Sequence, residues 1–133
     1  QNWGQYQACL HSNTYMHVLS GESTNNWNNA IQLYVMHNVH APLVGLERDY
    51  SGSNYSCKST IGSVPYNSWC KVRFERNGTS IKVYINDVLN NSLTIPSTLP
   101  FNFNLSGVRI GSASWSAYAY LNAYLRKLNI GNL

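Results

Sequence analysis

The chain has 133 residues, 44% of them hydrophobic, and we expect one folded domain that spans residues 1–133. Only 11% of the residues are charged, and nine scattered basic residues against five acidic ones lack the dense basic footprint of a nucleic-acid-binding protein. No apolar run approaches the length of a membrane span, so we expect no membrane insertion.

Short strand-like runs separated by turn signals follow one another along the chain, and no segment keeps a helical period. The expected strands cover residues 15–20, 30–37, 43–49, 55–61, the two arms of a hairpin within 69–86, 88–95, 108–111 and 117–130. The last run changes its apolar parity, which predicts a β-bulge near Arg126 and Lys127. About nine or ten strands of this kind predict an all-β protein, an antiparallel β-sandwich.

The hairpin within residues 69–86 is the clearest local feature. Asn77 and Gly78 predict a type I′ turn, because both tolerate a positive φ. One face of the hairpin is apolar and the other is wet, and the wet face is either ordinary solvated surface or a surface that contacts anions. The expected cross-strand pairs are Phe74–Ile81, Val72–Val83 and Cys70–Ile85 on the apolar face, and Lys71–Tyr84, Arg73–Lys82 and Glu75–Ser80 on the wet face.

The three cysteines leave two interpretations open. Cys57 and Cys70 flank a turn-rich stretch and could form a disulfide, in which case Cys9 is free or bonds to another chain. Alternatively all three are small buried residues in a reducing setting. The first residue is Gln, which is typical of a mature chain or an excised domain, and sequons at Asn54, Asn77, Asn90 and Asn104 are consistent with secretion.

The hairpin and the last strands resemble the concanavalin A-like lectin/glucanase superfamily, including laminin G-like domains. The residues that carry this likeness are Trp69, Val72, Gly78, Tyr84, Asn86, Asp87, the strand 108–111 and the closing strand 120–130. Val88 stands where the family commonly has Gly. The resemblance covers residues 65–133 and implies a jelly-roll sandwich, which galectins and the galectin-like heads of rotavirus spike proteins share. The galectin sugar-binding motif is absent, and residues 37–40 do not match it.

Carboxylates are too few for an obvious catalytic or metal site. Glu47 and Asp49 lie on one strand face and match two of the three carboxylates of the superfamily's glucanases, so a glycoside hydrolase is the less favoured alternative. Calcium prefers several carboxylates, which five scattered acids do not supply, and we expect no metal and no cofactor. A weak calcium site at Asp87, or at Glu47 and Asp49, stays open.

Neutral polar and aromatic loop residues favour glycan recognition. Trp27 lies among asparagines and Trp115 among small residues, and exposed rings can cover the apolar face of a sugar. The expected ligand-binding residues are Trp27, His37, His40, Arg48, Trp115 and Tyr118. We therefore expect a non-enzymatic, lectin-type domain that binds glycans or glycoproteins, including sialylated or sulfated ones, with an extracellular or virion-surface location and a homodimer as an option. A laminin G-type protein–protein interaction module is the alternative.

Overall fold

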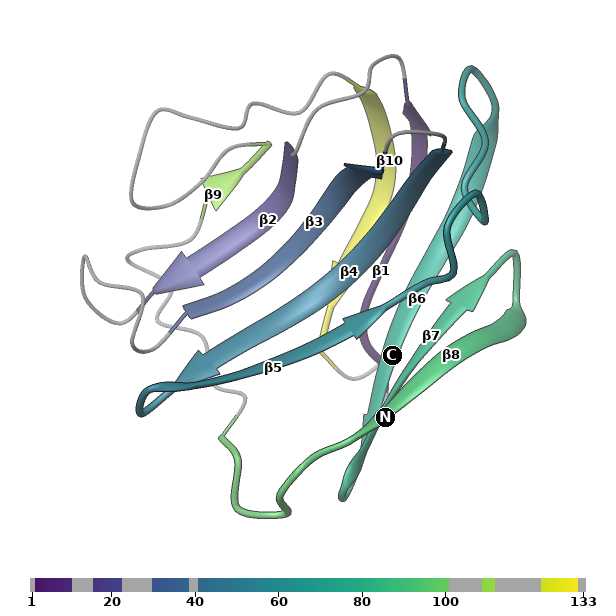
Figure 1. Ribbon diagram of the computed structural model, residues 1–133. Coiled ribbons are helices and arrows are strands. Elements are labelled where there is room, and N and C mark those ends of the chain that lie inside the picture. Colours follow the sequence, from purple (N-terminus) through teal and green to yellow (C-terminus); the bar gives the residue numbers. More distant parts are fainter. Residues whose placement is uncertain are drawn as a thin grey trace.

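Two antiparallel five-stranded sheets pack face to face in the computed structural model (Figure 1). The structure describes residues 2–10, 16–22, 30–38, 41–100, 109–111 and 123–131. One sheet has the strand order β10-β1-β6-β7-β8 and the other β5-β4-β3-β2-β9. The strands are β1 (Asn2–Leu10), β2 (Met16–Glu22), β3 (Ala30–Asn38), β4 (Ala41–Tyr50), β5 (Ser53–Lys58), β6 (Trp69–Asn77), β7 (Ser80–Ile85), β8 (Val88–Thr94), β9 (Arg109–Ile110) and β10 (Ala123–Ile130). The expected antiparallel β-sandwich is confirmed.

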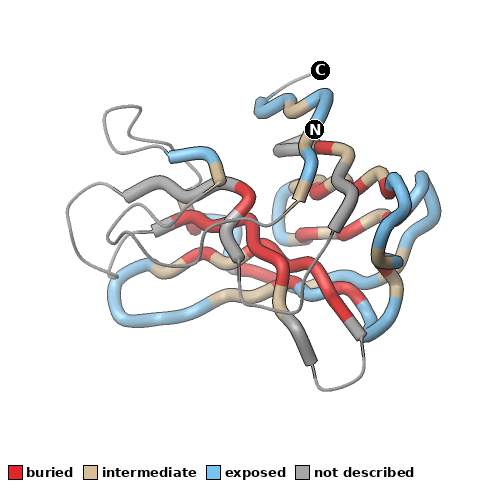
Figure 2. Tube along the Cα trace, turned by 90° about the horizontal axis from the view of Figure 1, so that it is seen from above, coloured by how far each residue is buried: buried red, intermediate tan, exposed pale blue. Residues whose placement is uncertain are grey.

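The core lies between the sheets and is built from alternate residues of the central strands. Figure 2 shows buried and less buried residues alternating along the strands, with exposed residues at the turns. Val72, Phe74 and Val83 have no exposed surface, and Leu33 of the facing sheet has none either. Alternation of this kind is what a strand with one buried face requires, because successive side chains point to opposite faces.

The β6–β7 hairpin keeps its predicted faces but not its predicted register. Phe74 lies opposite Val83 rather than Ile81, a shift of two residues along β7. The two-residue loop is Gly78–Thr79, in which Gly78 has a φ of 55°, as at the first position of a type II′ turn. The expected type I′ turn at Asn77-Gly78 and its pairs are therefore wrong. A shift of two leaves each side chain on its own face, so the apolar face stays apolar.

The correction changes the wet face of the hairpin. Arg73 lies opposite Tyr84, and Lys82 opposite Glu75, so the expected like-charge pair does not form. The guanidinium of Arg73 lies 3.7 Å from the centre of the Tyr84 ring, and its NH1 atom lies 2.6 Å from an oxygen of Glu75. The positive charge of Arg73 is therefore stabilised by the Tyr84 ring and the Glu75 carboxylate, and it does not face Lys82 directly.

Strand β1 was not expected from the sequence, and it lies between β10 and β6, one strand in from the edge of its sheet. It pairs with β6 and with β10. Lys127 and Leu128 of β10 lie together opposite Tyr6, and Lys127 has a φ of 53°. The bulge expected near Arg126 and Lys127 is confirmed.

Both described thiols that could have formed a disulfide are free. Cys57 and Cys70 are each 1% exposed and unbridged, so the expected disulfide alternative is wrong and the buried-thiol interpretation holds for these two. Burial raises the pKa of both thiols, that of Cys57 to about 11. The side chain of Cys9 lies outside the described residues. Within the described ranges, no helix is long and apolar enough to cross a membrane.

Candidate functional site

A line of polar residues runs from strand to strand across the β5-β4-β3-β2-β9 sheet. Strand pairing connects Arg109 to Ser20, Ser20 to Gln32, Gln32 to Glu47, and Glu47 to Ser56. We call these five residues the polar row. Ile31 and Leu33 belong to the core between the sheets, so Gln32 lies on the opposite face, where it is fully buried. The row therefore places an exposed arginine and a partly buried carboxyl group on one face, on either side of a buried amide.

Tyr34, two residues after Gln32 on β3, packs across β4 and bonds to β5. It pairs with Gly45, and a Cβ atom on Gly45 would lie 2.4 Å from Cζ of the Tyr34 ring. The ring therefore covers Gly45 at a distance that only a glycine permits. The Tyr34 hydroxyl and Ser56 Oγ are hydrogen-bonded at 2.9 Å. Burial raises the pKa of Tyr34 to about 12, so this hydroxyl stays protonated at neutral pH.

Two carboxyl groups and an amide meet at the β4–β5 end of the sheet. Asn54 Nδ2 donates a hydrogen bond of 2.7 Å to Asp49 Oδ1. Burial, and then the negative charge of Asp49, raises the pKa of Glu47. The buried Asp49 Oδ2 atom accepts no hydrogen bond from the described part of the chain. The partly exposed carboxyl group of Glu47 is thus the acceptor at this corner that a ligand hydroxyl can reach.

The two charged members of the polar row, Arg109 and Glu47, have opposite charge and different exposure. Arg109 is exposed on β9, whereas Glu47 is partly buried on β4. An arginine fork binds a carboxylate through two parallel hydrogen bonds, and a carboxylate accepts from hydroxyl and amide N–H groups. The face can therefore contact a ligand that carries both an acid group and hydroxyls.

Of the expected ligand-binding residues, the side chain of Arg48 alone lies in the described part of the chain. Arg48 is 2% exposed; its Nε donates to the Pro100 carbonyl oxygen and its NH1 to the Asp49 carbonyl oxygen, each at 2.9 Å. It joins β4 to the segment that follows Ile95, which is a structural task, and its contact with a ligand stays a prediction. The backbone of His37 belongs to β3, opposite Pro42. Trp27, His40, Trp115 and Tyr118 lie outside the described residues.

Local sequence patterns do not reveal the polar row. Gln32 falls within the expected strand 30–37 and Arg109 within the expected strand 108–111, and nothing in either pattern shows that the two share a face. The signal that joins them is strand order, which brings residues from five separate segments into one line. Among the described residues, no three His, Cys, Asp or Glu side chains gather in a way that could hold a metal ion.

Solved structures with the same fold are carbohydrate-binding modules. The CBM40 of the Ruminococcus gnavus IT-sialidase superposes with a TM-score of 0.73 at 20% identity, covering 99% of this chain and 78% of that one. The same module bound to alpha2,3 sialyllactose gives 0.73 at 20%, covering 99% and 77%, and bound to alpha2,6 sialyllactose 0.63 at 18%, covering 99% and 78%. No protein-family model matches the sequence, and no curated protein matches it.

These likenesses define the class of fold. The chain is an all-β sandwich with the architecture of the CBM40 modules along nearly its whole length. At identities of 20% and below they show the fold alone, and the ligand has to be argued from this chain's own residues.

Proposed function

We propose that this protein is a non-catalytic, lectin-type carbohydrate-binding domain that binds sialylated glycans through the outer face of the β5-β4-β3-β2-β9 sheet. The observation that carries the proposal is the polar row, which ends in an exposed arginine. The guanidinium of Arg109 suits the carboxylate of a sialic acid, and Glu47, three strands away, suits the hydroxyl donors of a sugar further along the glycan. The shared fold with modules solved with sialyllactose supports the same ligand class.

The carboxyl groups near Glu47 are too few for the glucanase pattern. A glycosidase needs a general acid and a nucleophile or base on either side of the scissile bond. Glu47 and Asp49 match two of the three carboxylates of the superfamily's glucanases, and the third is absent from the strand. We infer a binding role for this pair.

Broader features belong to the same proposal. A glycan ligand implies an extracellular or virion-surface location. We also propose that the β-sandwich belongs to the concanavalin A-like superfamily. A homodimer would double the number of sites and raise avidity. Size-exclusion chromatography with light scattering tests the last point directly.

Titration by NMR or calorimetry tests the ligand. Alpha2,3- and alpha2,6-sialyllactose should bind and plain lactose should bind more weakly, because lactose has no carboxylate. Arg109→Gln should weaken sialyllactose binding about tenfold, the usual effect of losing one charge-assisted pair. Glu75→Gln, a charge change of the same size on the other sheet, is the matched control for Glu47→Gln.

The alternatives have distinct outcomes. Absence of binding to any sugar on a glycan array, together with capture of a protein partner that survives glycan removal, would refute the proposal in favour of an interaction module. Cleavage of an oligosaccharide that Glu47→Gln abolishes would refute the non-catalytic assignment.

A further inference from the structure

The outer face of the other sheet, β10-β1-β6-β7-β8, concentrates positive charge. It carries five of the nine basic residues of the chain but only two of the five acids. The basic residues are Lys71, Arg73, Lys82, Arg126 and Lys127, and the acids are Glu75 and Asp87. This face lies on the far side of the sandwich from the polar row, so the two surfaces cannot share one small ligand.

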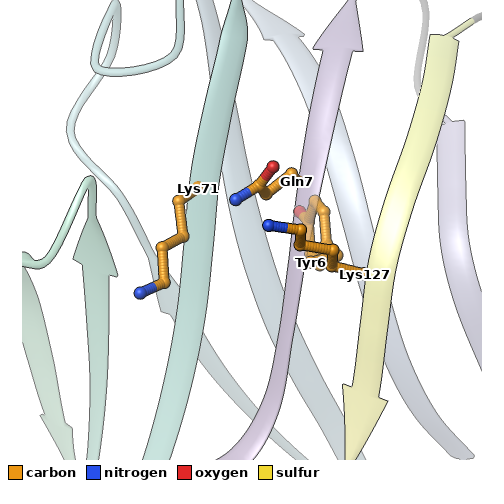
Figure 3. A pocket seen from close by; sticks show the side chains of 4 residues that line it. All are labelled: Tyr6, Gln7, Lys71 and Lys127. Atoms are coloured by element: carbon orange, nitrogen blue, oxygen red, sulfur yellow. The ribbon is translucent and has the colours of Figure 1, made fainter.

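A pocket of about 190 Å³ opens in this face where the β10 bulge meets β1. Tyr6, Gln7, Lys71 and Lys127 line it, and we call it the basic pocket. In Figure 3 the Lys127 side chain reaches over β1, with its ammonium group pointing toward the Gln7 amide, while the Lys71 side chain extends away from them. The bulge explains this direction, because an extra residue in a strand redirects the side chain that it carries.

The amide of Gln7 has a fixed orientation. Arg126 Nε lies 2.5 Å from Gln7 Oε1. An arginine can only donate, so the atom of Gln7 that it contacts must be the carbonyl oxygen. The amide nitrogen and its two N–H donors therefore face the other way, toward the Lys71 side of the pocket (Figure 3). The pocket thus presents the donors of the Gln7 amide and the ammonium group of Lys127, while the ammonium group of Lys71 points away from it.

Two exposed aromatic residues lie two positions along β6 and β10 from the residues that pair with Gln7. The Arg126 guanidinium lies 3.9 Å from the centre of the Trp69 ring, and Trp69 is 43% exposed. Tyr124 is 66% exposed, and strand pairing places it across β1 from Trp69, since both lie opposite Cys9. An exposed ring beside fixed cations offers an apolar plane to the flat face of a sugar and donors to its acid group.

The Lys71 ammonium already has one ion-pair partner. It lies 2.7 Å from Asp87 Oδ1, and both side chains are substantially exposed. Lys127 has no ion pair within the described residues. Tyr6 packs in the hydrophobic core, so its buried hydroxyl takes no part in the pocket. The ammonium group of Lys127, which has no ion pair in the described part of the chain, is what an anion would satisfy.

From these contacts we propose that the basic pocket is a second saccharide site, which takes the carboxylate or sulfate group of an acidic sugar while Trp69 and Tyr124 cover the sugar ring. The proposal rests on the proposed function in taking a glycan as the ligand class. Two sites on opposite faces would let a single chain bridge two glycans and gain avidity without dimerising. A pocket of this size admits one acid group and not a nucleic-acid backbone, whose binding needs a longer basic track.

The test uses sialyllactose, a sulfated chondroitin disaccharide, inorganic sulfate and lactose as probes. Lys127→Gln should weaken binding of an acidic saccharide about tenfold and leave lactose unchanged. Gln7→Glu is the sharper variant, because it keeps an acceptor for Arg126 and puts a negative charge where the amide N–H groups point. Asp87→Asn should strengthen binding severalfold, since it removes an acid and releases Lys71.

Lys82→Gln is the matched control, because it removes the same charge from the same face outside the pocket, and it should change the affinity less than twofold. Loss with sialyllactose alone, or with the sulfated disaccharide alone, would assign the acid group. Unchanged affinity in both Lys127→Gln and Gln7→Glu would overturn the proposal, and so would equal binding of inorganic sulfate and the sulfated disaccharide. Loss of binding in Arg109→Gln but not in Lys127→Gln would overturn this site and leave the proposed function standing. Loss of binding in Lys127→Gln but not in Arg109→Gln would support this site and overturn the proposed binding through the polar row.

Discussion

A single methyl group at Gly45 should measurably destabilise the sandwich. A Cβ atom there would lie 2.4 Å from Cζ, 2.5 Å from the hydroxyl oxygen and 2.8 Å from Cε1 of Tyr34. The ring cannot swing aside freely, because Tyr34 is 1% exposed and its hydroxyl is bonded to Ser56. Overpacking costs about 1–3 kcal/mol, and loss of the Tyr34–Ser56 hydrogen bond adds about 0.5–1.5 kcal/mol. Gly45→Ala should therefore lower the free energy of unfolding by roughly 2–4 kcal/mol.

Urea denaturation and thermal melting measure the effect. At roughly 3–5 °C per kcal/mol for a domain of this size, Tm should fall by about 10 °C. Ser56→Ala gives the hydrogen-bond part alone, about 1 kcal/mol. Tyr34→Leu removes the obstructing ring, so the double variant with Gly45→Ala should cost at least about 1 kcal/mol less than the sum of the single variants. A cost below about 0.5 kcal/mol for Gly45→Ala, or strict additivity in the double variant, would refute the packing argument.

Three further predictions concern ionisation and backbone strain. Burial and the charge of Asp49 raise the pKa of Glu47, so the folded protein becomes less stable as pH rises through the interval between the unfolded and folded pKa values of this group. The free energy of unfolding of Glu47→Gln, relative to that of the wild type, should therefore be higher at pH 7 than at pH 4. A difference between the two proteins that does not change with pH would contradict this. In a Cys9→Ser background, Cys57 and Cys70 should react with a thiol reagent at pH 8 far more slowly in the native than in the unfolded protein, because both are buried with raised pKa values; rapid native labelling would show that they are accessible. Asp87 has a φ of 68°, so Asp87→Gly should stabilise the protein by roughly 0.5–1 kcal/mol in urea unfolding, more than its exposed ion pair contributes; a lower midpoint would contradict the strain argument.

The faces of the strands could be predicted from the sequence, but the register of the hairpin could not. Both the expected and the observed pairing put Phe74 and Val83 on the buried face, so the hydrophobic pattern does not distinguish them. The turn decides the register, and here Gly78 takes the first loop position although Asn77-Gly78 is the stronger local signal. The pair of positive φ values expected of a type I′ turn occurs instead at the next loop, where Asn86 has 50° and Asp87 has 68°.

Strand β1 illustrates what local patterns omit. Its segment contains Gly4 and glutamines in place of a clean apolar alternation, and only Tyr6 of its described side chains is buried. It is held by two partners far away in the sequence, β6 and β10. Pairing between segments far apart in the sequence cannot be read from a short stretch of residues. The basic pocket depends on such pairing, and the polar row depends on the order of the strands in its sheet.

The two outer faces differ in charge, so the salt dependence of ligand binding distinguishes their contacts. Glu47 and Asp49 give the β4–β5 corner acceptors for hydroxyl groups, whereas Lys127 and Lys71 give the basic pocket its positive charge. Interactions between exposed charges weaken with salt, while hydrogen bonds from neutral hydroxyls to a partly buried carboxyl group depend on it much less. Raising the ionic strength from about 0.05 to 0.5 M shortens the Debye length by roughly threefold. It should therefore weaken an acidic sugar at the basic pocket and at Arg109, and leave a neutral sugar at the corner nearly unchanged, so that salt separates the contacts that depend on charge from those of the corner in a wild-type titration.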